Sequence, residues 1–190
     1  MAGPDDSDEE LMRRYASGDV AAFEALYERH ERRIWRYLTR NLRDPATAEE
    51  LMQEVWFTVA RQAAAYRPTA RFTTWLYTLS HHRMIDVLRA RRPAVRLDEL
   101  DDADAQHAQA LAAPRSTEPD ALLQDRQQQQ RLLAALARLP LEQRGALLMH
   151  LDGELSVEEI AAATGTSFET AKSRLRYARA KLRELLAEEP

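Results

Sequence analysis

The sequence contains no cysteine, only five glycines and no long apolar run. Without cysteine there can be neither disulfide bonds nor a thiolate metal site. No apolar stretch approaches the roughly 18 residues that a membrane span requires, so membrane insertion is not expected. The N-terminal segment is acidic, whereas a secretory signal is basic and then apolar. These absences favour a cytoplasmic protein.

Patterns typical of β-strands are also scarce. Runs of β-branched residues are few, while Ala, Leu, Arg, Glu and Gln are abundant, which favours helices. Apolar residues make up 45% of the 190 positions, which is enough for a folded core. We therefore predict an all-α protein.

Charge is segregated along the chain. The net charge of −4 argues, taken alone, against a nucleic-acid partner. However, residues 61–96 hold eight arginines and one acid, residues 97–125 hold eight acids and one arginine, and residues 170–183 hold six cations and no acid. Two basic surfaces separated by an acidic spacer fit two DNA-binding units. Chance clustering, or an acidic segment that shields basic surface in the free protein, would give the same pattern.

Helix start and stop signals divide the chain into two parts. Ser7, Asp19 and Asp44 are helix N-cap candidates in the first part, which ends with a basic helix at about 73–92. The following stretch contains three prolines, scattered acids and little periodicity, as linkers do. We predict two small helical domains joined by a flexible acidic linker: 8–92, the linker 93–124, and 125–187.

Residues 155–186 predict two helices joined by a tight turn. Ser156 with Glu159, and Thr166 with Glu169, can form capping boxes for the two helices. The second helix has an apolar stripe formed by Ala171, Leu175, Ala178, Leu182 and Leu185. Beside it runs a cationic stripe formed by Lys172, Arg176, Arg179 and Arg183. A buried seam with a cationic flank suits the DNA major groove, although a solvated basic face is the plainer interpretation.

Three segments, in this order and spacing, resemble those of bacterial sigma factors. TAEELMQEVWFTVA at 47–60 is similar to the helix that binds RNA polymerase, and FTTWLYTLSHHRMIDVLRARR at 72–92 to the helix that melts the promoter and reads the −10 element. Residues 139–183 resemble the domain that reads the −35 element. Having only two domains and a short linker, the chain is identified as a member of the extracytoplasmic-function (ECF) subfamily.

The resemblance implies a function and a set of partners. It implies a protein that gives core RNA polymerase its promoter specificity, binds promoter DNA, needs no cofactor and is not an enzyme. It also implies an anti-sigma factor as a partner.

The resemblance further implies a polymerase-binding site on the clamp coiled coil of the largest subunit, formed by Glu50, Leu51, Met52, Gln53 and Glu54. Helical spacing alone places Glu50, Gln53 and Glu54 on one face. A solvated helix face explains these three residues equally well.

The −10 contacts are expected at a proline-broken loop and on the helix after it, at Tyr66, Arg67, Thr69, Arg71, His82, Arg83, Arg89 and Arg92. A loop that holds single-stranded bases needs a stacking surface and cations for phosphates, and this loop offers both. Family members often carry asparagine where this chain has His82. This departure leaves the preferred base open.

The −35 contacts are expected on the last helix, at Lys172, Ser173, Arg174, Arg176, Tyr177 and Arg179. Lys172 and Ser173 match the contacting pair of the family's recognition helix. Tyr177 stands where many members carry arginine, and the adjacent Arg176 can take over that role. Arg174 and Arg179 are assigned to phosphates or ion pairs.

Two other classes of protein fit part of this sequence. A stand-alone helix-turn-helix regulator would use residues 8–92 to sense a signal or to dimerise. An enzyme could use His81, His82 and Asp86 as metal ligands, because His82 and Asp86 are four residues apart on a helix. No catalytic dyad or phosphate-binding glycine loop accompanies them.

Overall fold

The computed structural model describes residues 6–91 and 119–187, with side-chain surroundings from residue 126 onward in the second part. The described residues form α-helices, one short 3-10 helix and no strand, which confirms the all-α prediction. The elements are α1 (Asp8–Ala16), α2 (Val20–Leu42), α3 (Pro45–Gln62), η1 (Ala63–Ala65), α4 (Phe72–Arg91), α5 (Pro119–Ala137), α6 (Leu141–Gly153), α7 (Val157–Thr164) and α8 (Phe168–Ala187).

Four helices start at the predicted N-cap residues Ser7, Asp19, Asp44 and Ser156, but the side chains of Asp19 and Asp44 form no cap hydrogen bond. The Ser7 hydroxyl accepts a hydrogen bond from the Glu10 amide at 3.2 Å. Ser156 and Glu159 form the predicted capping box at the start of α7, with hydrogen bonds of 3.2 and 2.8 Å. Gly165 ends α7 with a φ of 65°, a left-handed conformation that glycine adopts without strain.

The predicted capping box of Thr166 and Glu169 is wrong. The Ser167 hydroxyl instead accepts the hydrogen bond from the Thr170 amide, at 3.1 Å. Thr166 is occupied elsewhere, because its hydroxyl lies 3.0 Å from that of Thr164. The signal was therefore real but lay one residue further along the chain.

Helix α5 begins earlier than the sequence predicts. It starts at Pro119, inside the stretch 93–124 that the sequence assigns to the linker. Proline is well tolerated in the first turn of a helix because that turn needs no amide donor, so Pro119 can start a helix rather than exclude one. The rest of the predicted linker lies outside the described residues.

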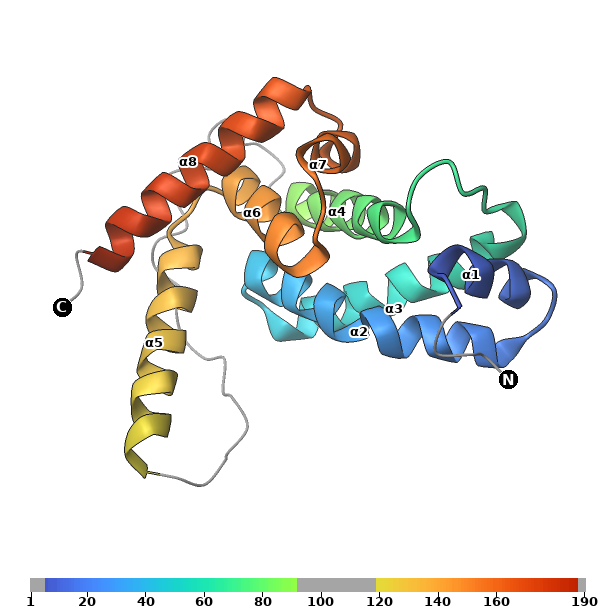
Figure 1. The fold of residues 1–190 in the computed structure, drawn as a ribbon, viewed down its shortest axis with the longest axis horizontal. Helices are drawn as coiled ribbons and strands as arrows, with labels where there is room; N and C mark the ends of the chain where they lie inside the picture. The colour runs from blue at the N-terminus through green and yellow to red at the C-terminus, as the bar shows by residue number, and fades with distance from the viewer. Residues whose placement is uncertain (1–5, 92–118, 188–190) are drawn as a thin grey trace.

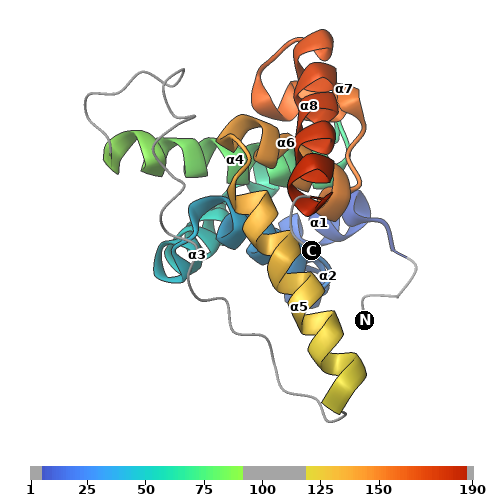
Figure 2. The ribbon, with the colours of Figure 1, turned by 90° about the vertical axis from the view of Figure 1, so that its left-hand side faces the viewer.

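The two parts of the chain pack together (Figure 1). Helix α2 is the long central element: it packs on α1 and α3 in the first part and on α6 in the second. Helix α7 lies against α4, and α8 lies over α6 and α7, while α5 projects from the body in both views (Figures 1 and 2). One continuous hydrophobic cluster includes Tyr37 and Tyr77 from the first part and Leu148 and Leu155 from the second.

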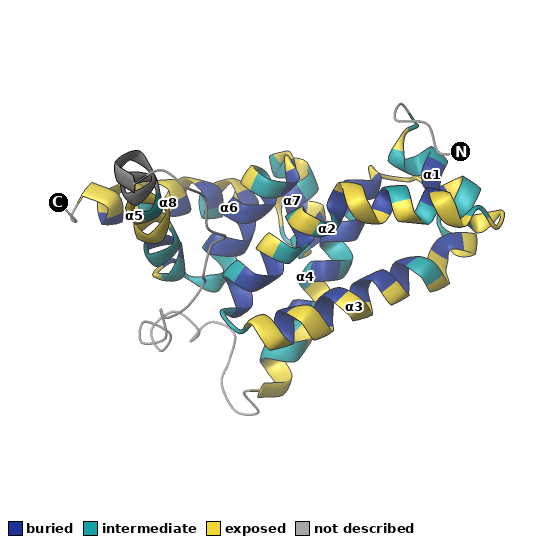
Figure 3. Cartoon of the chain, turned by 90° about the horizontal axis from the view of Figure 1, so that it is seen from below, coloured by how far each residue is buried: buried dark blue, intermediate teal, exposed yellow. Residues whose placement is uncertain are grey.

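Burial follows the helical periodicity of the sequence. Figure 3 shows α2 and α3 with buried and exposed residues alternating along each helix, as expected for helices packed on one side. Among the described residues no helix is both long and apolar enough to cross a bilayer. Nor do three His, Asp or Glu side chains gather there in a way that could hold a metal ion.

Candidate nucleic-acid and polymerase interfaces

Helix α3 presents an acidic edge to solvent. Glu50, Gln53 and Glu54 are exposed on it, as their spacing predicts. Leu51 and Met52 are only 2% and 8% exposed, and both belong to the core. The surface of the predicted polymerase-binding segment is therefore mainly polar and acidic.

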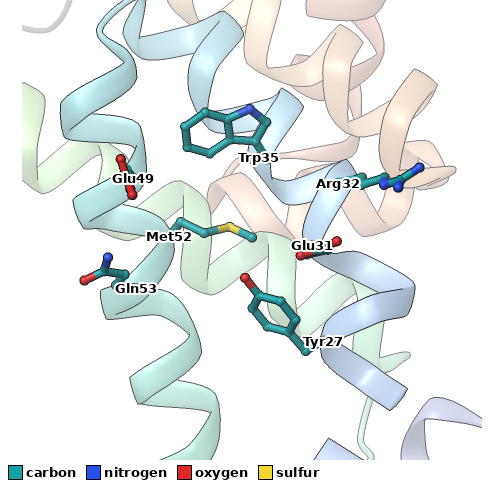
Figure 4. A pocket seen from close by; sticks show the side chains of 7 residues that line it. All are labelled: Tyr27, Glu31, Arg32, Trp35, Glu49, Met52 and Gln53. Carbon is teal, nitrogen blue, oxygen red and sulfur yellow. The ribbon is translucent and has the colours of Figure 1, made fainter. Parts of the chain in front are cut away.

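A groove adjoins this acidic edge, between α2 and α3 (Figure 4). Its lining includes the apolar side chains of Tyr27, Trp35 and Met52. Glu31 and Glu49 line it as well, one from each helix. Met52 and Gln53 belong both to the groove and to the predicted site, so the edge and the groove form one continuous surface. The sequence does not reveal the groove, because its two walls lie far apart in the chain.

The loop between η1 and α4 rests on an aromatic cluster. Tyr66 is half-buried, and its ring centroid lies 5.1 Å from that of Trp75 and 6.1 Å from that of Phe72. Burial, with the nearby Glu9 and Asp8 carboxylates, raises the pKa of Tyr66 to about 12. Part of the Tyr66 ring therefore packs against Trp75 and Phe72 and is not exposed to solvent. Three further residues of the predicted −10 site, Arg67, Thr69 and Arg71, are exposed.

Helix α4 carries its cations toward solvent. His82 and Arg89 are exposed, and Arg83 is half-buried, while Ser80 and Met84 face the core. Arg92 lies outside the described residues.

His81, the neighbour of His82, is half-buried and is not among the predicted −10 residues, although the enzyme alternative names it as a candidate metal ligand. Its Nδ1 lies 2.9 Å from the Tyr37 hydroxyl. Burial, with the positive fields of His82 and Arg174, lowers the pKa of His81 to about 4. The ring is therefore neutral at pH 7. A neutral imidazole can accept a hydrogen bond from the Tyr37 hydroxyl at Nδ1.

This half-buried imidazole makes the stability of the fold decrease in mild acid. Its pKa is lower in the folded than in the unfolded state, so between pH 6.5 and about 4 the unfolded chain binds the extra proton. We expect the free energy of unfolding to drop by roughly 1–2 kcal/mol from pH 7 to pH 5, the full shift being reduced because the ring keeps some solvent contact. Urea unfolding at both pH values measures this, and His81→Gln should show a smaller drop. An equal drop in both proteins would contradict the assignment.

Helix α8 separates its faces as predicted. Ala171, Leu175, Ala178 and Leu185 are buried, while Lys172, Arg176, Arg179 and Arg183 are exposed. The Arg176 guanidinium lies over the Tyr177 ring, 4.8 Å from its centroid, so these two side chains form one unit on the surface. Arg174 forms an ion pair with Glu142 of α6, and Ser173 is half-buried.

Arg144 on α6 joins the two parts of the chain, and nothing in the sequence singles it out. It is 3% exposed. Its guanidinium donates to the carbonyl oxygens of Leu139 at 3.0 Å and Ala137 at 3.3 Å, and to that of Asn41 at 3.1 Å. These carbonyls lie at or near the C-terminal ends of α5 and α2. A cation is favourable there because helix C-termini carry partial negative charge.

Comparison with known families gives two matches in the same order as the two parts. The family described as "Sigma-70 region 2" matches residues 26–93, and the family described as "Sigma-70, region 4" matches residues 129–182. Among curated relatives, RNA polymerase sigma factor CarQ of Myxococcus xanthus is 36% identical over 93% of this chain and 96% of its own length. ECF RNA polymerase sigma factor RpoE of Cereibacter sphaeroides is 32% identical over 87% of each chain.

Two solved structures share the fold. CnrH, in complex with the cytosolic domain of CnrY, superposes with a TM-score of 0.69 at 21% identity and covers 97% of this chain and 100% of its own. The sigma factor RpoE of Bartonella quintana, in complex with the anti-sigma factor NepR, has a TM-score of 0.63 at 21% identity, covering 94% and 99%. At these identities the likeness concerns the arrangement of helices alone.

Proposed function

This chain belongs to the ECF sigma factors of the sigma-70 family, and from that premise we propose which of its surfaces meet RNA polymerase and which meet promoter DNA. Sigma factors are transcription initiation factors rather than enzymes. The chain directs core RNA polymerase to its promoters, and we infer that it catalyses no reaction itself and acts in the cytoplasm. The observation that carries this function is the pair of sigma-70 regions, present in order over most of the chain.

The acidic edge of α3 and the adjoining groove form the proposed polymerase-binding surface. Glu50, Gln53 and Glu54 provide the exposed edge, and Met52 connects it with the groove. Glu31 and Glu49 outnumber Arg32 at the groove, so its lining carries a net negative charge, which suits a basic side chain on the clamp coiled coil of the largest subunit. Leu51 supports this surface from the core.

Charge reversal at Glu54 should weaken assembly with the core enzyme. The side chain is exposed, so Glu54→Arg should leave folding intact while it replaces attraction at the interface with repulsion. We expect roughly tenfold weaker binding, measured by titration of labelled protein with core enzyme.

Glu24→Arg is the matched control for this change. Glu24 is exposed on α2, outside the proposed surface, and carries the same charge. It should bind core enzyme as the wild type does. If Glu54→Arg melted at a lower temperature but assembled normally, Glu54 would be a structural residue instead.

The first DNA surface is the proposed −10 site. Arg67, Thr69 and Arg71 on the loop, with His82 and Arg89 on α4, are exposed and can reach phosphates and unpaired bases. Arg71 also lies 3.6 Å from the Glu159 carboxylate of α7. Because Tyr66 is half-buried against Trp75, it offers a base one edge of an aromatic cluster rather than a free ring.

The second DNA surface is the exposed face of α8, the proposed −35 site. Lys172 and Ser173 lie near its N-terminal end, the end by which recognition helices reach base edges. Arg176 and Tyr177, stacked on each other, follow one turn later. Arg179 is placed for phosphates, and Arg174 is held by Glu142.

Run-off transcription with core enzyme on a genomic library tests the function directly. Discrete promoter-dependent transcripts that require this chain are expected. A stand-alone helix-turn-helix regulator would neither co-purify stoichiometrically with core enzyme nor give such transcripts. The function must be abandoned if the purified chain, free of inhibitors, does not associate with core enzyme at low salt.

We also propose that an anti-sigma factor holds this chain inactive. The support is the solved relative RpoE of Bartonella quintana, which was crystallised with its anti-sigma factor NepR. A protein that co-purifies with this chain from its native cells should, when added back, abolish the run-off transcripts. Transcription that persists at saturating amounts of that protein would argue against an anti-sigma role.

A further inference from the structure

Helix α1 lies beside the loop of the proposed −10 site. This loop, residues 66–71, runs from η1 to α4, and α1 packs against both of these elements (Figure 1). Leu11 and Met12 of α1 are fully buried, which anchors the helix in the core. Helix α1 is therefore a fixed support next to the loop.

The first amide of α4 is capped by a side chain of α1. The Phe72 N–H donates a 2.8 Å hydrogen bond to a carboxylate oxygen of Glu9, which lies 63 residues earlier in the chain. The first amides of a helix have no acceptor within the helix, and a side chain just before the helix usually supplies one. Here a separate helix supplies it, and the negative charge of Glu9 suits the partial positive charge of a helix N-terminus.

Asp8, the residue before Glu9, ties α1 to α2. Its carboxylate oxygens lie 2.7 Å from His30 Nε2 and 2.6 Å from the Arg29 guanidinium, both on α2. The His30 ring is buried and its centroid lies 5.4 Å from that of Phe72. Because neighbouring residues of a helix move together, these contacts also fix where the Glu9 carboxylate lies relative to α4.

The cap on Phe72 fixes one end of the loop. Arg71, the last loop residue, is bonded directly to Phe72. The Thr69 amide donates to the Arg67 carbonyl at 2.8 Å, within the loop. Such a local hydrogen bond shapes a loop but does not place it on the protein, so the position of the loop depends on its two ends.

The other end of the loop also rests on Phe72. The Tyr66 ring packs against the rings of Phe72 and Trp75, with centroids 6.1 and 5.1 Å away. The Tyr66 hydroxyl is buried and has no hydrogen-bond partner among the described residues. The position of the ring therefore depends on packing, and Phe72, which Glu9 holds by its backbone, forms part of the surface beneath it.

We propose that Glu9 is a positioning residue for the proposed −10 site, whose carboxylate caps α4 and thereby holds the loop 66–71 in the geometry that receives unpaired promoter bases. The inference rests on the proposed function, which assigns this loop to the −10 element. Glu9 touches no DNA and acts through Phe72. A loop that is already in its binding geometry loses less entropy when it captures a base, so loss of the cap slows promoter opening.

Hydrogen exchange of the Phe72 amide tests the contact in the free chain. Glu9→Ala removes the acceptor, whereas Glu9→Gln keeps an oxygen acceptor in nearly the same place. The amide should exchange roughly tenfold faster in Glu9→Ala and nearly as in the wild type in Glu9→Gln, measured by NMR. The matched control is Glu10→Ala, because Glu10 is the next residue, carries the same charge and pairs with Arg13 of its own helix. It should exchange as the wild type does.

Promoter opening tests the positioning role. Holoenzyme is assembled with each variant on a promoter found by run-off transcription, and strand separation is followed by permanganate reactivity of unpaired thymines. Glu9→Ala should open the promoter about three- to tenfold more slowly while binding core enzyme as tightly as the wild type. Glu9→Gln should restore most of the opening rate, and Glu10→Ala should open normally. The preference for an intact over a scrambled −10 element should fall only in Glu9→Ala.

The proposal is overturned if Glu9→Ala opens promoters at the wild-type rate, or if Glu9→Gln opens them as slowly as Glu9→Ala. A parallel loss of core binding and thermal stability would make Glu9 a general structural residue instead. If Glu9→Ala does not fold, Glu9→Asp takes its place, because it keeps the charge but withdraws the oxygens by one methylene and should also slow opening.

Failure of the proposed function looks different from failure of this inference. In that case neither the wild type nor any variant would bind core enzyme or open a promoter. Exchange of the Phe72 amide in the free chain would still show whether Glu9 caps α4.

Discussion

Arg144→Met is expected to destabilise the protein by about 2–4 kcal/mol. Methionine keeps most of the side-chain volume and can neither donate a hydrogen bond nor carry a charge. The carbonyls of Leu139 and Asn41 would lose the donors that Arg144 supplies in the interior. Each buried carbonyl left without a donor costs about 1–3 kcal/mol. Urea unfolding followed by circular dichroism measures the change.

Arg138→Met is the control for this substitution. Arg138 lies six residues earlier and is exposed, so its replacement should change the free energy of unfolding by no more than about 0.5 kcal/mol. If the two variants were equally stable, the hydrogen bonds of Arg144 to α2 and α5 would contribute nothing.

Lys172→Ala is expected to reduce transcription from promoters that depend on the −35 element by about five- to 150-fold, the equivalent of the 1–3 kcal/mol that a good base contact contributes. The Lys172 side chain is 61% exposed, and its nearest acid, Glu169, lies at 3.9 Å, which is a weak surface pair. Its removal should therefore leave the fold unchanged. Run-off transcription on matched templates with intact and scrambled −35 elements gives the measurement.

Lys181→Ala removes the same charge from the same helix, two and a half turns later. Lys181 pairs with Glu184 near the C-terminal end of α8, away from the proposed base-reading end. It should lose much less activity, and equally on both templates. A loss from Lys172→Ala that was the same on both templates would mean that Lys172 contacts phosphates or polymerase instead of bases.

The local features of the fold could be predicted from the sequence because they depend on residues close together in the chain. The capping box of Ser156 and Glu159 spans three residues, and the buried stripe of α8 recurs every three or four. Where such predictions failed, they failed by one residue or at one boundary. The cap of α8 is at Ser167 instead of Thr166, and α5 starts at Pro119, because several adjacent residues can cap or start a helix.

Exposure of side chains on the proposed surfaces could likewise be predicted where it depends on one helix alone. Exposure of Glu54, Lys172 and Arg89 follows from helical periodicity. Partial burial of Tyr66 does not, because it depends on Trp75 returning to the loop from the next helix. The role of His81 was likewise hidden, since its partner Tyr37 lies 44 residues away.

By itself, then, the sequence determined the helices, the face that each helix buries, the segregation of charge and the family. The tertiary structure alone decided how the two parts meet: Asp152 reaches Arg40 across 112 residues, and Arg144 reaches Asn41 across 103. Helix signals act within one or two turns, whereas a contact between distant segments depends on where every intervening helix places them. No local pattern records that placement.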